Sequence, residues 1–213
     1  MQGDAVSETA LRERVSRETW EKFQHYERLL RQWQRKTNLV ANSTLDDIWA
    51  RHFTDSLQFL DLMPGATRVA DIGSGGGFPG LVIAILLSEQ HPQAHIHLIE
   101  SVTKKCAFLR QVARGVGVAD NVTVHDERAE SVLPSLDDLD VLTARALAPL
   151  SVLFDLGESV LSRGTIGVFA KGRDHRLEID MAAKDWHFDC EVTPSRTENG
   201  SVLLRVSNVR RKD

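Results

Sequence analysis

The residues with the clearest chemical potential lie between Arg68 and Gly80, where the chain reads R-V-A-D-I-G-S-G-G-G-F-P-G. Asp71 closes a short apolar run, glycines follow it, and Pro79 precedes a second apolar run over residues 81–87. Glycine permits positive φ and lets a ligand approach without meeting a Cβ atom, and proline is tolerated in the first turn of a helix. The pattern predicts a buried strand, a glycine-rich loop and a helix, which form a nucleotide-type ligand site in open α/β sheets.

Two ligand classes fit this loop. Gly75, Gly77 and Gly80 satisfy the dinucleotide pattern G-x-G-x-x-G. Asp71 and Gly73 extend it to D-x-G-x-G-x-G, which resembles motif I of class I S-adenosylmethionine (SAM) methyltransferases. A carboxylate at the strand end repels a pyrophosphate but attracts the sulfonium and ammonium groups of SAM. The sequence therefore favours SAM over NAD, and a tight turn that binds nothing is the remaining alternative. No Gly-Lys-Ser/Thr follows the loop, which argues against a P-loop.

Further polar residues follow the next two predicted strands. Glu100 ends the second strand about 20 residues after the last loop glycine, a spacing that places a carboxylate on a ribose diol in SAM and NAD proteins alike. Asp126, Arg128, Ala129 and Glu130 follow the third strand, where an adenine ring would lie. A polar helix start explains that second group equally well.

Cations end the fourth and fifth predicted strands, at Arg145 and Lys171. Ligands collect at the carboxyl ends of parallel strands, so Arg145, beside the glycine-loop strand, is the stronger candidate. The sequence does not choose whether Arg145 holds the methionine carboxylate, a guanine or a phosphate.

The missing motifs favour an acceptor that needs no general base. The chain has no Asp/Asn-Pro-Pro-aromatic tetrad, no cysteine that follows a proline, and no Ser-His-Asp order supported by spacing. Guanine N7 is such an acceptor, because its lone pair is free at neutral pH and the enzyme need only align it with the methyl group. Arg145 or Arg128 could bond guanine O6 or a nearby phosphate. This argument permits guanine without identifying it.

Composition restricts the partners and the surroundings. The 213 residues carry a net charge of -4 and a pI of about 6.1, so RNA binding would need a local basic patch. Arg28, Arg31, Arg35 and Lys36 could form one, although cations are also favoured near a helix C-terminus. The two cysteines show no metal-ligand spacing, and no apolar run reaches membrane-spanning length. The start of the chain does not resemble a signal peptide. We therefore expect a cytoplasmic protein.

The remaining pattern divides the chain into a helical extension over residues 1–63 and a core over residues 64–213. In the extension, we expect a loose start to about residue 8, a helix over 7–36, and helical segments capped by Ser43 or Thr44 that run to about Leu62. In the core, strands are expected at 67–72, 95–100, 121–126, 140–144 and 165–170, with a final hairpin of 187–193 and 201–206 around Asn199-Gly200. Helices are expected at 79–90, from a cap at Ser101 or Thr103 to 114, at 149–161 and at 174–185. This order predicts an α/β, Rossmann-like fold with a seven-stranded, mostly parallel sheet, the arrangement of class I SAM methyltransferases.

Several motifs then stand in the order typical of one family. They are W-Q-R-K-T-N-L (33–39), R-H-F-T-D-S-L (51–57), D-I-G-S-G-G-G-F-P-G (71–80), E-S-V-T-K-K (100–105), R-A-E (128–130), A-R-A (144–146) and A-K-G (170–172). Together they resemble the RsmG (GidB) family of bacterial guanine-N7 methyltransferases of 16S ribosomal RNA. The resemblance implies SAM contacts from Gly73, Phe78, Ala129-Glu130 and Arg145. Glu100 stands where the family commonly has Asp, and Thr143 where Ser is usual, and both keep the chemical group.

Our expectations for the site combine these patterns. The predicted SAM-binding residues are Asp71, Gly73, Gly75, Phe78, Glu100, Ala129, Glu130 and Arg145, of which Arg145 also positions substrate. The predicted RNA-binding residues are Arg31, Arg35, Lys36, Arg51, His52, Arg128 and Lys171, and the C-terminal cations Arg210-Arg211-Lys212 could add to them. We expect no metal, a monomer, and 16S rRNA in the small subunit or its precursor as the partner. A small-molecule SAM methyltransferase and a non-catalytic SAM- or NAD-binding module are the alternatives.

Overall fold

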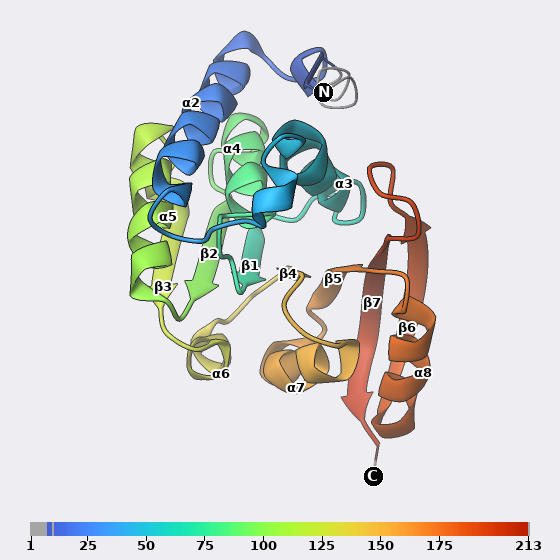
Figure 1. Cartoon of the computed structure of the whole chain (residues 1–213). Coiled ribbons are helices and arrows are strands. Elements are labelled where there is room, and N and C mark those ends of the chain that lie inside the picture. Colours follow the sequence, from blue (N-terminus) through green and yellow to red (C-terminus); the bar gives the residue numbers. More distant parts are fainter. Residues whose placement is uncertain (1–7, 10, 213) are drawn as a thin grey trace.

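One seven-stranded sheet organises the molecule (Figure 1). The structure is a computed structural model that describes residues 8, 9 and 11–212. The sheet has the order β3-β2-β1-β4-β5-β7-β6, and β7 alone runs antiparallel to its neighbours. The strands are β1 (Arg68–Ile72), β2 (His95–Glu100), β3 (Val122–Asp126), β4 (Val141–Arg145), β5 (Ile166–Lys171), β6 (Trp186–Pro194) and β7 (Val202–Arg211). The predicted seven-stranded, mostly parallel sheet is confirmed.

The strand order reverses direction between β1 and β4. The chain winds outward from β1 to β2 and β3, and then returns to β4 on the other side of β1. In the β1–β4 pairing Asp71 lies opposite Thr143 and Ile72 opposite Ala144, so Arg145 follows at the same edge. This reversal is the place where open α/β sheets bind ligands.

Helices cover both faces of the sheet. On one face, α4 packs on β1 and β2, α5 packs on β2 and β3, and α2 lies against both helices (Figure 1). The other face carries α6, α7 and α8. The helices are α2 (Arg17–Gln34), α3 (Asp55–Asp61), α4 (Gly80–Gln90), α5 (Thr103–Gly115), α6 (Ala129–Val132), α7 (Leu150–Leu161) and α8 (His175–Asp185). Short 3-10 turns lie at η1 (Asn42–Thr44), η3 (Ala119–Asn121) and η4 (Leu133–Ser135), and η2 (Trp49–Thr54) is π-helical.

The N-terminal segments share one hydrophobic core with the sheet. Tyr26 from α2 and Phe53 from η2 are fully buried and meet Phe78, which follows the glycine loop. Trp49 stacks on Trp20 and on Phe53, with ring centroids 4.8 and 4.6 Å apart. Because these rings belong to the same cluster as the apolar residues of α4, the extension forms part of the wall around the sheet edge.

Two local expectations about helix starts are wrong. Ser43 and Thr44 do not cap a helix: they belong to η1, and the Thr44 hydroxyl donates to the carbonyl of Ala41 at 2.7 Å. The helix after β2 has no side-chain cap either, because Val102 is its N-cap residue and Thr103 is already its first residue. The helix predicted over residues 7–36 is interrupted: residues 8, 9, 11 and 12 are helical, a turn follows, and α2 begins at Arg17, where the Ser16 hydroxyl accepts a hydrogen bond from the Thr19 amide. The loose start expected before residue 8 lies outside the described residues.

The β6–β7 connection is longer than a two-residue hairpin turn. Residues 195–201 form a loop in which Gly200 has a φ of +84°, so the predicted turn at Asn199-Gly200 is present at its end. Within the part of the chain that the structure describes, no helix has the length and apolar character needed to cross a membrane.

Candidate active site

The glycine loop between β1 and α4 is held open by backbone bonds to β2. Gly73 and Ser74 both donate their amides to the carbonyl of Ile99, at 2.9 and 3.2 Å. Gly73, Gly75 and Gly77 have φ values of +65°, +53° and +89°, a backbone region that residues other than glycine rarely adopt. The loop therefore needs these glycines for its path as well as for access.

Asp71 lies beneath this loop and supports it. Its carboxylate accepts the Thr143 hydroxyl at 2.9 Å and the Gly80 amide at 3.3 Å, which joins β1, β4 and the start of α4. The side chain is fully buried. Burial raises the pKa of Asp71 to about 6, although hydrogen bonds from Thr143 and Gly80 oppose the rise. Asp71 thus acts on the ligand site through the loop and through its charge.

Two aromatic residues brace the loop from the helical extension. Tyr26 donates its hydroxyl to the carbonyl of Gly76 and stacks on Phe78, with ring centroids 5.2 Å apart and planes 15° apart. Phe78 in turn carries the Arg145 guanidinium 5.2 Å from its ring centre. Desolvation raises the pKa of Tyr26 well above its usual value, so the hydroxyl stays a hydrogen-bond donor.

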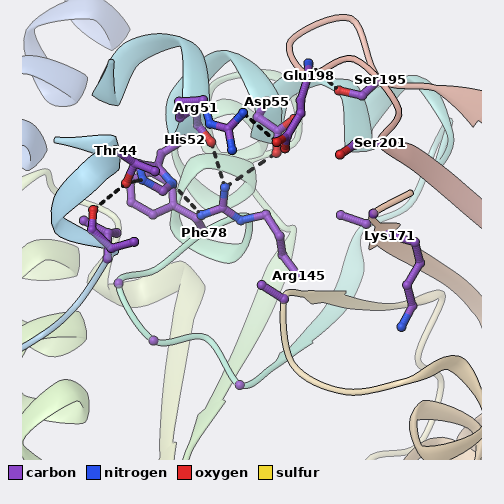
Figure 2. A pocket seen from close by; sticks show the side chains of 18 of the residues that line it. Thr44, Arg51, His52, Asp55, Phe78, Arg145, Lys171, Ser195, Glu198 and Ser201 are labelled. Carbon is purple, nitrogen blue, oxygen red and sulfur yellow. Dashed lines mark hydrogen bonds and ion pairs between the residues drawn. The ribbon is translucent and has the colours of Figure 1, made fainter. Parts of the chain in front are cut away.

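Arg145 is the hub of the site (Figure 2). Its Nη1 donates to the carbonyl of Arg51 at 2.9 Å and lies 3.5 Å from a carboxylate oxygen of Asp55. Its Nη2 lies 2.8 Å from Nδ1 of His52. These three partners come from η2 and α3, so the end of β4 is tied to the N-terminal extension.

The contacts of His52 fix its protonation state. A guanidinium has donors only, so His52 Nδ1 must accept from Arg145 and carry no proton. The proton is then on Nε2, which lies 2.8 Å from the Thr44 hydroxyl. That hydroxyl accepts from Nε2 and donates its own hydrogen bond to the carbonyl of Ala41. Burial and the charges of Arg145 and Arg51 lower the pKa of His52 to about 3, which agrees with a neutral ring.

The glycine loop and Arg145 line one cavity of about 550 Å³. The opposite wall comes from the segment just before η1 and from η1 itself, from η2, from the end of β5 and from the β6–β7 loop (Figure 2). Its lining includes Leu39, Val40, Ala41, Thr44, Arg51, His52, Asp55, Gly73, Gly75, Phe78, Lys105, Arg145, Lys171, Ser195, Glu198 and Ser201. This volume lies within the roughly 300–1,000 Å³ of small-molecule sites. The residues fit SAM, because the glycine wall admits close approach and an ionisable carboxylate lies beneath it.

The predicted SAM-binding residues fall into two groups. Gly73, Gly75, Phe78 and Arg145 line the cavity, and Asp71 lies below it. Glu100, Ala129 and Glu130 are not among its lining residues.

The carboxylate of Glu100 has a structural task in this structure. It is buried, and its two oxygens accept the amides of Gly75 and Val102 at 3.0 and 2.9 Å. Glu100 therefore shapes the loop, and its contact with a ribose stays a prediction. Ala129 and Glu130 begin α6, where Glu130 is exposed, and their ligand contacts also stay predictions.

The predicted RNA-binding residues are not gathered on one surface. Arg31, Arg35 and Lys36 are exposed on the last turns of α2 and just after it, and Arg31 pairs with Glu27 at 2.8 Å. Arg128 is exposed just before α6.

Arg51 and the C-terminal cations lie in different parts of the molecule. Arg51 lines the cavity and pairs with Glu198 at 2.9 Å. Arg211 lies at the far end of β7, where it stacks on Trp186 at 4.3 Å and pairs with acids of α7. The cations at the end of the chain therefore belong to a different part of the molecule from the cavity.

Two of the expected RNA contacts turn inward instead. His52 is buried and bound to Arg145 and Thr44, as described above. The ammonium of Lys171 donates to the carbonyl of Ala148 and pairs with Glu178 at 2.7 Å, so only 6% of its side chain is exposed. In both cases a partner distant in sequence uses the polar group that would have met a phosphate.

Sequence reasoning assigned no part in the ligand site to Tyr26, Thr44, Asp55 and Glu198. Asp55 lies in the family-like motif R-H-F-T-D-S-L, which was a usable signal. The other three lie outside those motifs: Tyr26 on α2 supports the glycine loop, and Thr44 on η1 and Glu198 on the β6–β7 loop reach the cavity only through tertiary packing. Among the residues that the structure describes, no group of three or more His, Cys, Asp or Glu side chains is arranged to hold a metal ion.

Comparison with known proteins gives consistent matches. The chain matches the family model GidB, described as rRNA small subunit methyltransferase G, over residues 19–201. The ribosomal RNA small subunit methyltransferase G of Methylorubrum extorquens strain PA1 is 45% identical over 199 residues, which are 93% of each chain. That of Methylorubrum populi is 41% identical over 213 residues and covers both chains completely.

Solved structures with low sequence identity share the fold. Cofactor-bound Rv0187 from MTB has a TM-score of 0.57 and 17% identity, with 91% of each chain covered. A mutant of MtNAS in complex with S-adenosylmethionine has a TM-score of 0.56 and 19% identity, with 84% of this chain and 72% of that chain covered. These two likenesses support the Rossmann-like methyltransferase fold alone.

Proposed function

The chain belongs to the GidB family of rRNA small subunit methyltransferases, and we propose that it transfers the methyl group of SAM to N7 of a guanine in 16S rRNA. The observation that carries the proposal is the shared cavity, in which the glycine loop and the Arg145 guanidinium lie on one wall. Gly73, Gly75 and Phe78 would hold SAM there, with Asp71 beneath them. SAM supplies an electrophilic methyl group on a sulfonium.

The side chains around Arg145 suit an acceptor that keeps its protons. His52 has no free ring nitrogen, because Nδ1 accepts from Arg145 and Nε2 donates to Thr44. Asp55 is bound to Arg145 and also accepts from Thr197 and Gln58. Neither group is available as a general base. Guanine N7 needs none, so the task of these residues is to orient the acceptor and the donor.

Arg145 is the residue that we expect to position the reactants. Three contacts from η2 and α3 fix the guanidinium of Arg145 at the cavity wall, so this side chain would lose little conformational entropy when a ligand binds there. Arg145→Lys keeps the charge but cannot reach the same partners together. We expect that variant to lose transfer activity while the protein stays folded.

The test uses SAM with a radioactive methyl group and small-subunit particles from cells that lack this gene. The labelled rRNA is digested, and the modified nucleoside and its position are identified. Label in a single N7-methylguanosine supports the proposal. Label in no RNA, with SAM binding intact, would select the small-molecule or the non-catalytic alternative, and binding of NAD instead of SAM would favour a dinucleotide module. We include in the proposal a cytoplasmic monomer, which analytical ultracentrifugation can check.

A further inference from the structure

The cavity continues past the glycine loop to a part that SAM binding does not use in our proposal. This part lies between η2, the end of β5 and the β6–β7 loop, and it contains the ion pair of Arg51 and Glu198 (Figure 2). The Nη1 of Arg51 lies 2.9 Å from an oxygen of Glu198. The two side chains are 34% and 45% exposed, so a ligand in the cavity can reach both.

The other charged groups on this side of the cavity are already used. Asp55 pairs with Arg145, and these two side chains are only 19% and 16% exposed. Lys171 turns away to Glu178. Arg51 and Glu198 are thus the cation and the carboxylate that this wall presents to a ligand.

The backbone that carries Glu198 is firmly held. The Ser195 hydroxyl accepts the amide of Glu198 at 3.2 Å, and Thr197 donates to Asp55 at 2.6 Å. Gln58, which is buried, accepts the amide of Arg196 at 2.7 Å. None of these contacts uses the carboxylate of Glu198, so the loop does not depend on that side chain for its anchoring to α3.

The backbone of Arg51 is also fixed by a hydrogen bond, and the carboxyl group of Glu198 stays ionised at neutral pH. The carbonyl of Arg51 accepts from Arg145, which links the pair to the hub of the site. Partial burial would raise the pKa of Glu198, but the hydrogen bond and charge of Arg51, with a hydrogen bond from Ser201 and the charge of Arg173, lower the pKa below its usual value. At neutral pH the side chain is therefore an acceptor only.

The pair presents one donor group beside two acceptor oxygens. The Watson–Crick edge of guanine carries the complementary order, with O6 as an acceptor followed by N1–H and N2–H2 as donors. N7 lies on the other edge of the base, so recognition of the Watson–Crick edge leaves it free for the methyl group. Adenine presents N1 as an acceptor, and a carboxylate facing it would be left without a donor.

We propose that Arg51 and Glu198 read the Watson–Crick edge of the acceptor guanine, with Glu198 accepting from N1–H and N2–H2 and Arg51 donating to O6. This inference rests on the proposed function, because it assigns a specificity-determining role within the same site. It also makes Glu198 a contact of the base rather than a simple tether of the β6–β7 loop.

The experiment compares guanosine with inosine at the target position of the rRNA. The inosine base differs from guanine only in that it lacks the N2 amino group. The rRNA is ligated from pieces so that inosine replaces guanine at the position identified in the first assay, and the particle is reconstituted. The variants are Glu198→Gln and, as a matched control, Glu191→Gln. Glu191 also pairs with an arginine, Arg205 at 3.5 Å, and lies on β6 in the same hairpin but outside the cavity.

The wild type and Glu191→Gln should both prefer guanine to inosine by roughly tenfold or more in kcat/KM, the discrimination of a bidentate contact to a base edge. In Glu198→Gln the kcat/KM for guanine should fall by roughly tenfold or more and the preference should approach one, with SAM affinity unchanged. The preference is a ratio within one enzyme preparation, so a smaller folded fraction does not alter it.

The outcomes separate this inference from the proposed function. If the wild type methylates guanine but Glu198→Gln keeps the full preference over inosine, Glu198 does not read the base and the inference is overturned. A loss of rate with an unchanged preference would likewise make the ion pair a tether. If the wild type labels no RNA guanine at all, the proposed function itself fails.

Discussion

Tyr26 and Gly76 join two parts of the chain that are 50 residues apart, through a hydrogen bond from the tyrosine hydroxyl to the glycine carbonyl. Both residues are buried. The bond ties helix α2 to the loop that we assign to SAM binding, and the ring of Tyr26 also supports Phe78. The order of the glycine loop therefore depends on a residue outside the sheet.

The first prediction removes this bond in Tyr26→Phe. The ring and its stacking on Phe78 are kept, but the buried carbonyl of Gly76 loses its partner. We expect a loss of about 1–3 kcal/mol in the free energy of unfolding together with a clear loss of SAM affinity. Urea denaturation and titration calorimetry measure the two effects.

Thr165→Val is the matched control for Tyr26→Phe. The Thr165 hydroxyl donates to the buried carbonyl of Leu139 at 2.9 Å, outside the cavity lining. This variant should be destabilised on the same scale but should bind SAM as the wild type does. Equal SAM affinity in both variants would show that Tyr26 stabilises the fold without shaping the ligand site.

The second prediction uses two glycines with similar backbone strain. Gly73 has a φ of +65° and lines the cavity, where an added Cβ would collide with the side chain of Leu147. Gly65 has a φ of +76°, and nothing lies within 4 Å of an added Cβ. Gly73→Ala and Gly65→Ala should each lose roughly 1–2 kcal/mol of stability from the left-handed conformation.

Only Gly73→Ala should weaken SAM binding, because Gly73 lines the cavity and its added methyl group would have to displace Leu147 and shift the loop. Titration of both variants with SAM checks this difference. If Gly73→Ala binds SAM as well as Gly65→Ala does, the glycine at residue 73 serves the path of the loop and not the approach of the ligand.

The strands and the glycine loop could be predicted because their signals are local. The apolar run around Asp71, the glycines and the alternation from His95 to Glu100 each follow from residues adjacent in sequence. The expected strands differ from β1, β2 and β3 by no more than a residue at either end. The alternation of strands and helices, together with the rules for right-handed crossover connections, restricts the sheet to a few topologies, and the observed sheet has one of them.

The fate of single polar side chains could not be predicted in the same way. His52 and Lys171 resemble surface cations in sequence, but their partners Arg145 and Glu178 belong to other elements. Thr44 has the residue type of a helix cap, but its hydroxyl forms hydrogen bonds with the carbonyl of Ala41 and the ring of His52. Such contacts depend on tertiary packing, which residue type and spacing do not specify.

The third prediction concerns the neutral ring of His52. Its pKa falls from 6.5 in the unfolded chain to about 3 in the folded protein, so unfolding at acidic pH takes up a proton. The stabilisation from the neutral ring is therefore complete above about pH 6.5 and is lost as the pH falls toward 3, by about 1.4 kcal/mol per pH unit. Asp71, whose pKa is raised to about 6, has the opposite effect, because its contribution is lost as the pH rises through that value.

His52→Asn separates these opposing contributions. The asparagine oxygen can still accept from Arg145 but cannot titrate. The difference in unfolding free energy between wild type and variant should shrink as the pH falls from 6.5 to 4, as measured by urea denaturation. Nitrogen NMR of the wild type should find His52 protonated at Nε2 only, and a proton on Nδ1 would contradict the contact with Arg145.

The fourth prediction tests the basic end of α2 as an RNA surface. Arg31, Arg35 and Lys36 are exposed, and the chain runs directly from them to Leu39, which lines the cavity. Each phosphate contact releases counterions, so replacing all three by Ala should weaken RNA binding and flatten its dependence on salt. SAM affinity should not change. The matched control replaces three exposed cations near α7 and on α8, namely Arg163, Arg176 and Lys184.

Filter binding of small-subunit rRNA between 50 and 200 mM salt, about the range over which phosphate contacts are resolved, gives the slope for each protein. The control should keep the wild-type slope, because α8 lies on the opposite face of the sheet from α2 (Figure 1). An unchanged slope in the α2 variant would remove these three residues from the RNA surface. Equal losses in both variants would mean that net charge, rather than a patch at the cavity, governs the affinity, and Arg51 would then be the nearest cation to test.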